Sequence, residues 1–198
     1  MSQAPLNKST LHRQQHALKR YKRFLPSLDM KRRQLLLEQH KAREMEALLQ
    51  IQLEQIEAEV SAQLPMLGDD AIDPGDLVHI SGMELSHRNI MGIHLPILQQ
   101  LEINIRPYST LASPAWIDPL TLQLKRAIQT KIELHLAQTS LELLDQEVRK
   151  ITQRVNLFDK VLIPQSQEHI RRIQIYLSDL ERASVVRAKI AKRKRASS

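Results

Sequence analysis

An apolar residue recurs at every seventh position along much of the N-terminal part of the chain. The row consists of Tyr21, Leu28, Leu35, Ala42, Leu49 and Ile56. A second row, four residues on, is apolar at its ends but is interrupted by Arg32, Gln39 and Glu46. Sustained seven-residue spacing is typical of a helix that buries a narrow stripe against another helix. The feature therefore predicts a long helix that needs a partner.

A second stretch nearer the C-terminus has the same character. Steps of three and four residues alternate along Leu141, Leu144, Val148, Ile151, Val155, Phe158 and Leu162. Taken as helices, residues 10–64 and 119–190 would be roughly 80 and 105 Å long at about 1.5 Å per residue. Each stripe needs to be covered, so we predict a mainly α fold with a long antiparallel two-helix coiled coil. Its seam is expected to comprise these seven residues together with Leu28, Leu35, Leu49 and Ile56.

The pattern changes between the two predicted helices. Turn signals at Gly68 and Asp73-Pro74-Gly75 are followed by short β-branched segments at 77–80, 93–95 and 103–105. We predict a small β-hairpin, with or without a third strand or short helix, that leans on the helices because an isolated hairpin is marginal in water. The chain is thus expected to have three parts: an N-terminal coiled-coil helix in 1–64, a hairpin and loop segment in 65–118, and a C-terminal coiled-coil helix with a basic tail in 119–198.

Individual residues predict where the helices begin and bend. Asn7 or Ser9 is suited to cap the first helix, and Asp118 followed by Pro119 is a typical start for the second. Pro26 lies inside the first heptad series, where proline removes a backbone hydrogen bond and crowds the preceding turn at a cost of about 3 kcal/mol. A kink or break is therefore expected near Phe24–Ser27.

Charge is distributed unevenly along the chain. Residues 1–43 contain eleven Lys or Arg against two acids, residues 61–119 contain two against seven, and seven basic side chains follow Glu181. Two basic ends lying side by side would form one positive tip. The chain has no Cys, which excludes disulfides and thiolate metal sites. No apolar stretch approaches the roughly 20 residues of a membrane span, and the N-terminus has no apolar secretion signal. We expect a soluble cytoplasmic protein, or one that is peripheral to a larger assembly, without direct membrane insertion.

The sequence contains no arrangement that predicts catalysis, a cofactor or a metal site. The glycines fit neither phosphate-binding nor dinucleotide-binding spacing. His12 and His16 are one helical turn apart, but beside basic residues they are better explained as solvated side chains. Glu133 and His135 lie on different sides of their helix, and the remaining middle histidines are expected to pack or to face solvent. We therefore predict no catalytic, cofactor-binding or metal-binding residue.

Two features leave a binding role open. Lys192-Arg193-Lys194-Arg195 is a basic run that could contact nucleic acid, although no aromatic stacking residues or reading motif accompany it. Trp116 is expected either to pack against the start of the C-terminal helix or to lie in a partner interface. A basic coiled-coil protein that binds nucleic acid or serves as a scaffold is thus the alternative function.

Three segments resemble the D-subunit family of V/A-type ATPases. The run 154–158 (RVNLF) followed by 161–164 (VLIP) is similar to that family's Arg-Val-Asn-Ala-Leu-Glu run and the Ile-Pro after it. Residues 7–11 and 31–37 resemble its N-terminal helix, and 89–96 resembles its Asn-x-x-Gly-Val-x-x-Pro segment. The segments occur in the family's order and together cover nearly the whole chain. Pro26, the substitution of LFD for Ala-Leu-Glu at 157–159, and the sequence at 181–186 depart from the family pattern.

The resemblance implies a rotor shaft with no catalytic role and no cofactor of its own. Members of that family stand in the central stalk of a rotary ATPase or ATP synthase and transmit torque, which couples ATP hydrolysis or synthesis to proton or sodium transport. Their paired terminal helices lie inside the catalytic ring of A and B subunits. Their middle segment lies near the F subunit and the cap subunit of the membrane ring, and no nucleic acid is involved. The resemblance makes these residues candidates for partner contacts: Lys31, Arg32, Arg33, Asn89, Gly92, Pro96, Arg154, Asn156, Pro164 and Arg182.

Overall fold

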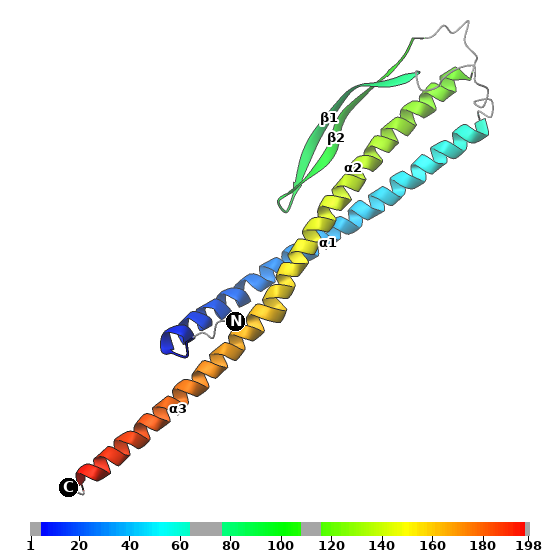
Figure 1. Cartoon of the computed structure of the whole chain (residues 1–198). Coiled ribbons are helices and arrows are strands. Elements are labelled where there is room, and N and C mark those ends of the chain that lie inside the picture. Colours follow the sequence, from blue (N-terminus) through cyan, green and yellow to red (C-terminus); the bar gives the residue numbers. More distant parts are fainter. Residues whose placement is uncertain (1–4, 64–76, 108–115, 197–198) are drawn as a thin grey trace. The chain divides into compact units, whose positions relative to one another are not determined.

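The chain forms long helices and one β-hairpin, which comes between them in the sequence (Figure 1). The computed structural model describes residues 5–63, 77–107 and 116–196. In chain order its elements are α1 (Lys8–Gln63), β1 (Val78–Ile90), β2 (Ile93–Ile105), α2 (Ile117–Asn156), the π-helical turn η3 (Leu157–Leu162) and α3 (Ile163–Ala196). The strands pair in one antiparallel two-stranded sheet. The predicted mainly α fold with a β-hairpin in the middle is confirmed.

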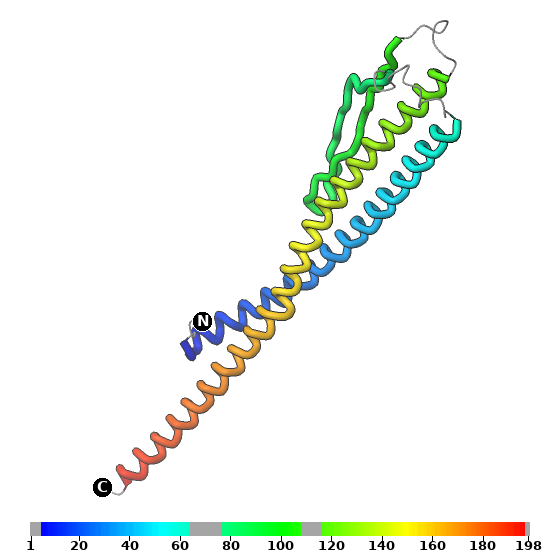
Figure 2. The backbone as a smooth tube through the Cα atoms, turned by 45° about the vertical axis from the view of Figure 1, so that its right-hand side comes forward, coloured from blue at the N-terminus to red at the C-terminus, as the bar shows by residue number. Residues whose placement is uncertain are grey.

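These elements belong to two compact units, each of which includes part of α1 and part of α2. The terminal unit consists of Met1–Arg33 and Arg149–Ser198, and the central unit of Gln34–Val148. In the central unit, α1 and α2 run side by side and the hairpin lies along α2 (Figures 1 and 2). The three-part organisation predicted above describes segments of sequence rather than compact units, and it stays a prediction.

Helix α1 begins with a side-chain cap. The backbone N–H of Thr10 donates to Oδ1 of Asn7 over 2.7 Å, which satisfies one of the amides that a helix leaves unpaired at its N-terminus. Thr10 is itself buried at 4% exposure. Of the two caps predicted, Asn7 fills the role, and Ser9 lies in the first turn of the helix.

Of the kink or break predicted near Pro26, the break is wrong, and the kink stays a prediction. Helix α1 continues through Pro26 as one helix of 56 residues. Proline has no N–H, so the carbonyl of Lys22, four residues earlier, receives no backbone hydrogen bond from Pro26. Both residues are exposed. Water can therefore solvate this carbonyl, and a proline on a solvated face need not end a helix that is held by packing on its other face. Nearby, the Ser27 hydroxyl donates to the Phe24 carbonyl at 2.8 Å.

The hairpin is longer and simpler than predicted. Its two strands have 13 residues each, and residues 103–105 are the end of β2 rather than a third strand. Two register shifts interrupt the ladder, one between Ile80 and Gly82 and one between Glu84 and Leu85. Shifts of this kind are bulges, which bend and twist a ribbon. One of the two bulges lies beside Gly82.

A two-residue turn joins the strands. Met91 and Gly92 have φ values of 55° and 90°, the pair of positive angles that characterises the tight turn whose twist matches the twist of paired strands. Oδ1 of Asn89 accepts a hydrogen bond from the Gly92 N–H at 2.9 Å. Asn89 therefore stabilises the turn.

The base of the hairpin packs into a small apolar cluster of the central unit. Leu77 and Val78 of the hairpin are buried with Ile117 and Leu120 of α2. Partly buried apolar side chains from α1, β2 and α2 surround them: Val60, Ile103, Trp116, Leu124 and Ile128. The hairpin therefore leans on the helices as predicted, and Trp116 packs against this cluster at the start of α2.

The predicted start of the C-terminal helix is displaced slightly. Helix α2 begins at Ile117, so Asp118 lies in its first turn rather than at the N-cap. An acidic side chain there still interacts favourably with the positive end of the helix dipole. The Thr121 hydroxyl donates to the Asp118 carbonyl at 2.8 Å. After Asn156 the helix widens into η3 and then continues as α3.

Replacement of Gly92 by Ala should weaken the hairpin and leave the helices intact. A side chain at a φ of 90° costs on the order of 1–2 kcal/mol. Hydrogen exchange of the β1 and β2 amides should therefore accelerate roughly tenfold. Gly82→Ala is the matched control, because its added Cβ would lie 3.4 Å from the Glu102 side chain, an ordinary contact. Equal exchange in the two variants would contradict the role assigned to the turn.

Candidate interaction surfaces

Large aliphatic side chains seal the contact between α1 and α2 in the central unit. Leu35 and Leu144 are 0% and 1% exposed, and Leu49 and Val148 are also buried. Burial of one such side chain contributes about 1.5–3 kcal/mol. We therefore expect this strip to contribute much of the stability of the helix pair.

Polar contacts beside the strip define the direction of pairing. The Gln39 side-chain amide donates to Oδ1 of Asp145, and Nη2 of Arg43 lies 3.5 Å from the same oxygen. Further along α1, Oε2 of Glu59 accepts from the Gln123 amide at 3.3 Å. As the residue number along α1 rises, the residue number of the contact on α2 falls, so the two helices are antiparallel. Gln39, which interrupts the apolar row in the sequence, is used here as a cross-helix hydrogen-bond donor.

The terminal unit has its own buried strip. Ile151, Val155 and Ile173 are 4%, 6% and 2% exposed. The rings of Tyr21 and Phe158 meet edge to face with their centroids 5.4 Å apart and an interplanar angle of 87°, a geometry that aromatic pairs favour. The other predicted seam residues are partly buried: Leu28, Ile56, Leu141 and Leu162. The role of all these residues in holding the helices together stays a prediction.

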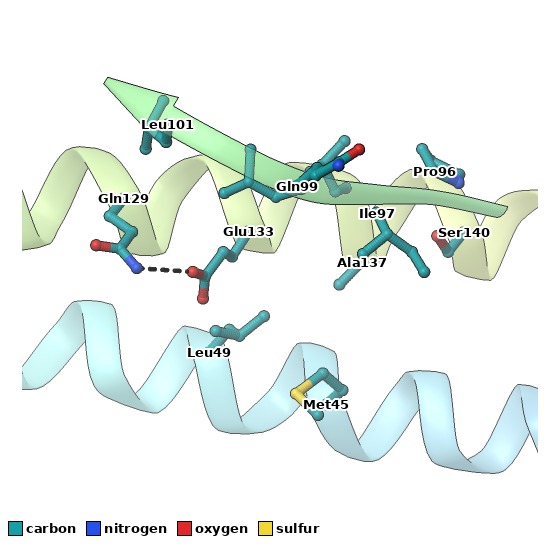
Figure 3. A pocket seen from close by; sticks show the side chains of 12 residues that line it. Met45, Leu49, Pro96, Ile97, Gln99, Leu101, Gln129, Glu133, Ala137 and Ser140 are labelled. Carbon is teal, nitrogen blue, oxygen red and sulfur yellow. Dashed lines mark hydrogen bonds between the residues drawn. The ribbon is translucent and has the colours of Figure 1, made fainter. Parts of the chain in front are cut away.

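A groove of about 500 Å³ separates the hairpin from the helix pair in the central unit (Figure 3). Met45 and Leu49 of α1 line it on one side, and Pro96, Ile97 and Leu101 of β2 on the other. Helix α2 contributes Gln129, Glu133, Leu136, Ala137 and Ser140. The sequence did not predict this groove, because it forms between elements that are far apart along the chain.

One carboxylate is the only charged group among the described residues that line the groove. Glu133 accepts a hydrogen bond from the Gln129 amide at 3.0 Å, and its side chain points from α2 toward Leu49 of α1 (Figure 3). Met45 and Ile97 are 54% and 43% exposed at the groove's edge. An open, mostly apolar groove with a single negative charge suits an apolar segment that carries one cation.

The two units carry opposite charge. The terminal unit contains 22 Lys or Arg and 5 Asp or Glu, whereas the central unit contains 7 and 17. The formal net charges are therefore +17 and −10. Fields of this size select partners of opposite charge and accelerate their encounter. The sequence predicted basic ends and an acidic middle, and the division into units makes the segregation sharper than the sequence segments do.

The first group of partner-contact candidates lies on α1 in the terminal unit. Asp29 pairs with Arg32 and Arg33 at 2.5 and 2.9 Å. Arg32 and Lys31 are partly buried, and the Arg33 side chain is 78% exposed. Of these three, Arg33 is therefore the most accessible to another protein.

The candidates near the C-terminus are mostly exposed. Arg154 and Arg182 lie on the surface, Pro164 is at the start of α3, and Asn156 is partly buried at the end of α2. Nη1 of Arg182 is 4.0 Å from Oδ1 of Asp179, a surface pair that contributes little to stability. These side chains are not gathered into one patch by any described contact.

The hairpin candidates differ from one another in role. Asn89 and Gly92 are exposed, and both are needed by the turn itself, as described above. Pro96 lines the groove, where a proline also removes one backbone donor from β2 and so discourages a further strand at that position. Pro96 is thus the candidate of this group that faces a surface suited to a partner.

The histidine pair near the N-terminus lacks a third ligand among the described residues. The rings of His12 and His16 are 4.4 Å apart. Across residues 5–63, 77–107 and 116–196 there is no group of three or more His, Cys, Asp or Glu side chains arranged to hold a metal ion. Within the same residues no helix is both long enough and apolar enough to cross a bilayer.

Comparison with known proteins identifies the family. Residues 10–193 match the family model for the D subunit of ATP synthase. The chain is 33% identical over 192 residues to the V-type ATP synthase D subunit of Borreliella burgdorferi, covering 97% of this chain and 95% of the relative. The corresponding proteins of Chlamydia muridarum and Chlamydia felis are 32% and 31% identical, over 98% of this chain and 96% and 94% of theirs. The chain belongs to the ATP synthase D-subunit family.

This membership confirms the resemblance recognised in the three sequence segments. The matched range includes the 31–37, 89–96 and 154–164 segments, and the relatives are covered almost from end to end. The chain therefore belongs to the family despite the features that depart from the family pattern. Two of them, Pro26 and the 157–159 run, lie in helical backbone, in α1 and η3.

Val155→Asp should separate the helices of this D-subunit family member. The aspartate would be buried at a position that is 6% exposed, where an unpaired charge costs several kcal/mol. The melting temperature and the helical circular dichroism signal should both fall. Gln153→Asp, on the exposed face two residues away, is the control and should change neither by much. Unchanged melting of the Val155 variant would contradict the proposed seam.

Proposed function

We propose that this chain is the central-stalk rotor subunit of a V/A-type rotary ATPase or ATP synthase. The match to the D-subunit family along residues 10–193 carries the proposal. In this role it has no catalytic site of its own and works at the membrane's cytoplasmic side as a peripheral part of the complex. It transmits torque between the catalytic ring of A and B subunits and the membrane ring, and so couples ATP chemistry to ion transport.

The two-helix construction supports a mechanical role. A coiled coil resists bending because every backbone hydrogen bond and a continuous apolar seam must be strained together. Its surface in the terminal unit is also uneven, since the two helices there differ in sequence and only one of them contains the π-helical turn η3. An uneven shaft makes different contacts with each catalytic interface around it. Such differential contacts are what allows one subunit to impose different states on identical sites.

The opposite charges of the two units support different neighbours for each. The terminal unit, with a net charge of +17, suits acidic surfaces inside the catalytic ring. The central unit, at −10, suits basic surfaces of the lower stalk, where the F subunit and the cap subunit would lie. The alternative of a nucleic-acid-binding coiled coil needs the basic tail but no groove or hairpin.

We further propose that the groove beneath β2 is where the lower-stalk neighbour docks. Its occupant would be a segment with one lysine or arginine among apolar side chains, because Glu133 is the only charged residue among the described lining and lies on an acidic unit. Pro96 lines one side of this groove.

The rotor role is tested by deletion and recovery. Cells that lack this chain should lose ATP hydrolysis or synthesis that depends on the ion gradient, and a tagged copy should restore it and co-purify with the A, B and F subunits. Recovery of the tagged chain as a free, monodisperse protein without these subunits would refute the proposal. DNA binding at low salt that neutralisation of residues 192–195 abolishes would instead favour the alternative.

The groove is tested by charge reversal. Glu133→Lys should weaken co-purification of the lower-stalk neighbour at least roughly tenfold, because a cation would face the partner's cation. Glu142→Lys is the control, since Glu142 is exposed on the same helix and does not line the groove. Equal recovery with both variants would show that the partner docks elsewhere.

A further inference from the structure

The turn η3 compensates for one extra residue in the apolar stripe of the C-terminal helix. From Leu144 to Leu162 the stripe advances in alternating steps of four and three residues. The same rhythm continued past Leu162 would place Gln165, His169 and Arg172 on the stripe, yet all three are exposed. The positions that are buried or partly buried lie one residue later: Ser166, Ile170, Ile173 and Leu177. One residue has therefore been inserted between two in-phase parts of the stripe.

The backbone absorbs this residue as a single wide turn. The N–H of Ile163 donates to the carbonyl of Phe158, five residues earlier, whereas an α-helix uses the carbonyl four residues earlier. The wider turn contains one residue more than an α-helical turn. The extra residue therefore does not rotate α3 about its axis relative to α2. The apolar face of α3 thereby stays aligned with that of the end of α2, and the insertion causes no change of stripe phase.

Pro164 makes this turn weaker than its neighbours. It stands directly after the wide turn, has no N–H to donate, and in a regular α-helix its ring would crowd the carbonyl of Lys160. None of the six residues of η3 is buried, although Val155 before it and Ser166 after it are each 6% exposed. Few packing contacts and missing backbone bonds are the features of a segment that opens easily.

Helix α1, which faces η3, also contains a proline near this turn. Phe158 of η3 packs edge-on against Tyr21 of α1, and Pro26 lies five residues further along α1, or roughly 7.5 Å at the helical rise. Because the helices are antiparallel, Pro26 and Pro164 lie on opposite sides of the aromatic pair. One contact between rings is thus flanked by a proline in each helix.

We propose that η3 and Pro164 form a compliant joint in the shaft, at which α3 bends and twists relative to the end of α2. The Tyr21–Phe158 contact serves as its pivot. The local flexibility stands on the geometry alone, whereas its mechanical use rests on the proposed rotor function. In that function the joint lets the C-terminal end of the shaft yield while a catalytic interface closes on it, so that rotation in discrete steps does not have to bend the whole coiled coil.

Deletion of Pro164 should remove the joint without disturbing the seam. The stripe would then continue in unbroken steps of three and four residues, and η3 should become ordinary α-helix. The melting temperature of the full-length chain should rise by about 5 °C or more. Hydrogen exchange of the amides from residue 157 to residue 163 should slow about tenfold or more.

Pro164→Ala is the matched control because it restores the N–H but keeps the inserted residue. The wide turn should persist in this variant, and exchange in residues 157–163 should slow much less than in the deletion. Deletion of Gln153, an exposed residue within the regular part of the stripe, should instead lower the melting temperature, since it puts the two halves out of phase. A Pro164 deletion that lowers the melting temperature or leaves exchange unchanged would overturn the joint.

The mechanical part is tested in the reassembled complex. The Pro164 deletion should change the rate of ATP turnover per assembled complex several-fold, whereas Pro164→Ala, which loses the same candidate partner contact, should lie closer to the wild type. A stiffened deletion variant with an unchanged rate would overturn the use of the joint in rotation. If the wild-type chain itself fails to assemble or to restore turnover, the rotor function is refuted, and the exchange result still decides whether the joint exists.

Discussion

The covering of one narrow apolar stripe by another is the interaction on which this protein depends. Aromatic residues make up only 3% of the chain, and the buried apolar side chains of the helices are leucine, isoleucine and valine along a seam. Leu35 and Leu144 at 0% and 1% exposure show how completely two helices can seal each other without a third layer. The hairpin adds a second, smaller cluster but cannot stand alone. Loss of the seam would leave both helices exposed to water.

The same architecture leaves most side chains on the surface, which is where function must reside. The features of this surface on which the proposed function rests are shape and charge. Opposite net charges on the terminal and central units provide selectivity between neighbours. A groove beneath β2 provides a hollow where a partner's apolar side chains can be buried.

Much of this could be predicted from short-range chemistry. The cap by Asn7, the tight turn at Gly92 and the heptad rows each depend on residues within one or two turns of each other. The predictions that failed concern backbone under competing influences. Pro26 is unfavourable locally but is tolerated because packing on the other face holds the helix, and its neighbours' polar groups reach water. Segments predicted as separate strands proved to be parts of two long ones, since bulges let a ladder continue across irregular sequence.

The sequence by itself determined that two long helices exist, that they need each other and that the middle of the chain is a hairpin. Apolar periodicity and turn residues specify these features locally. Only the tertiary structure decided that Gln39 would bond to Asp145, that a groove would form around Glu133, and that the stripe would be realigned by a π-turn before Pro164. The π-turn keeps the apolar face of α3 in phase with that of α2, and the first two features depend on which residues distant in sequence become neighbours. That choice is made by the packing of whole faces and not by any local pattern.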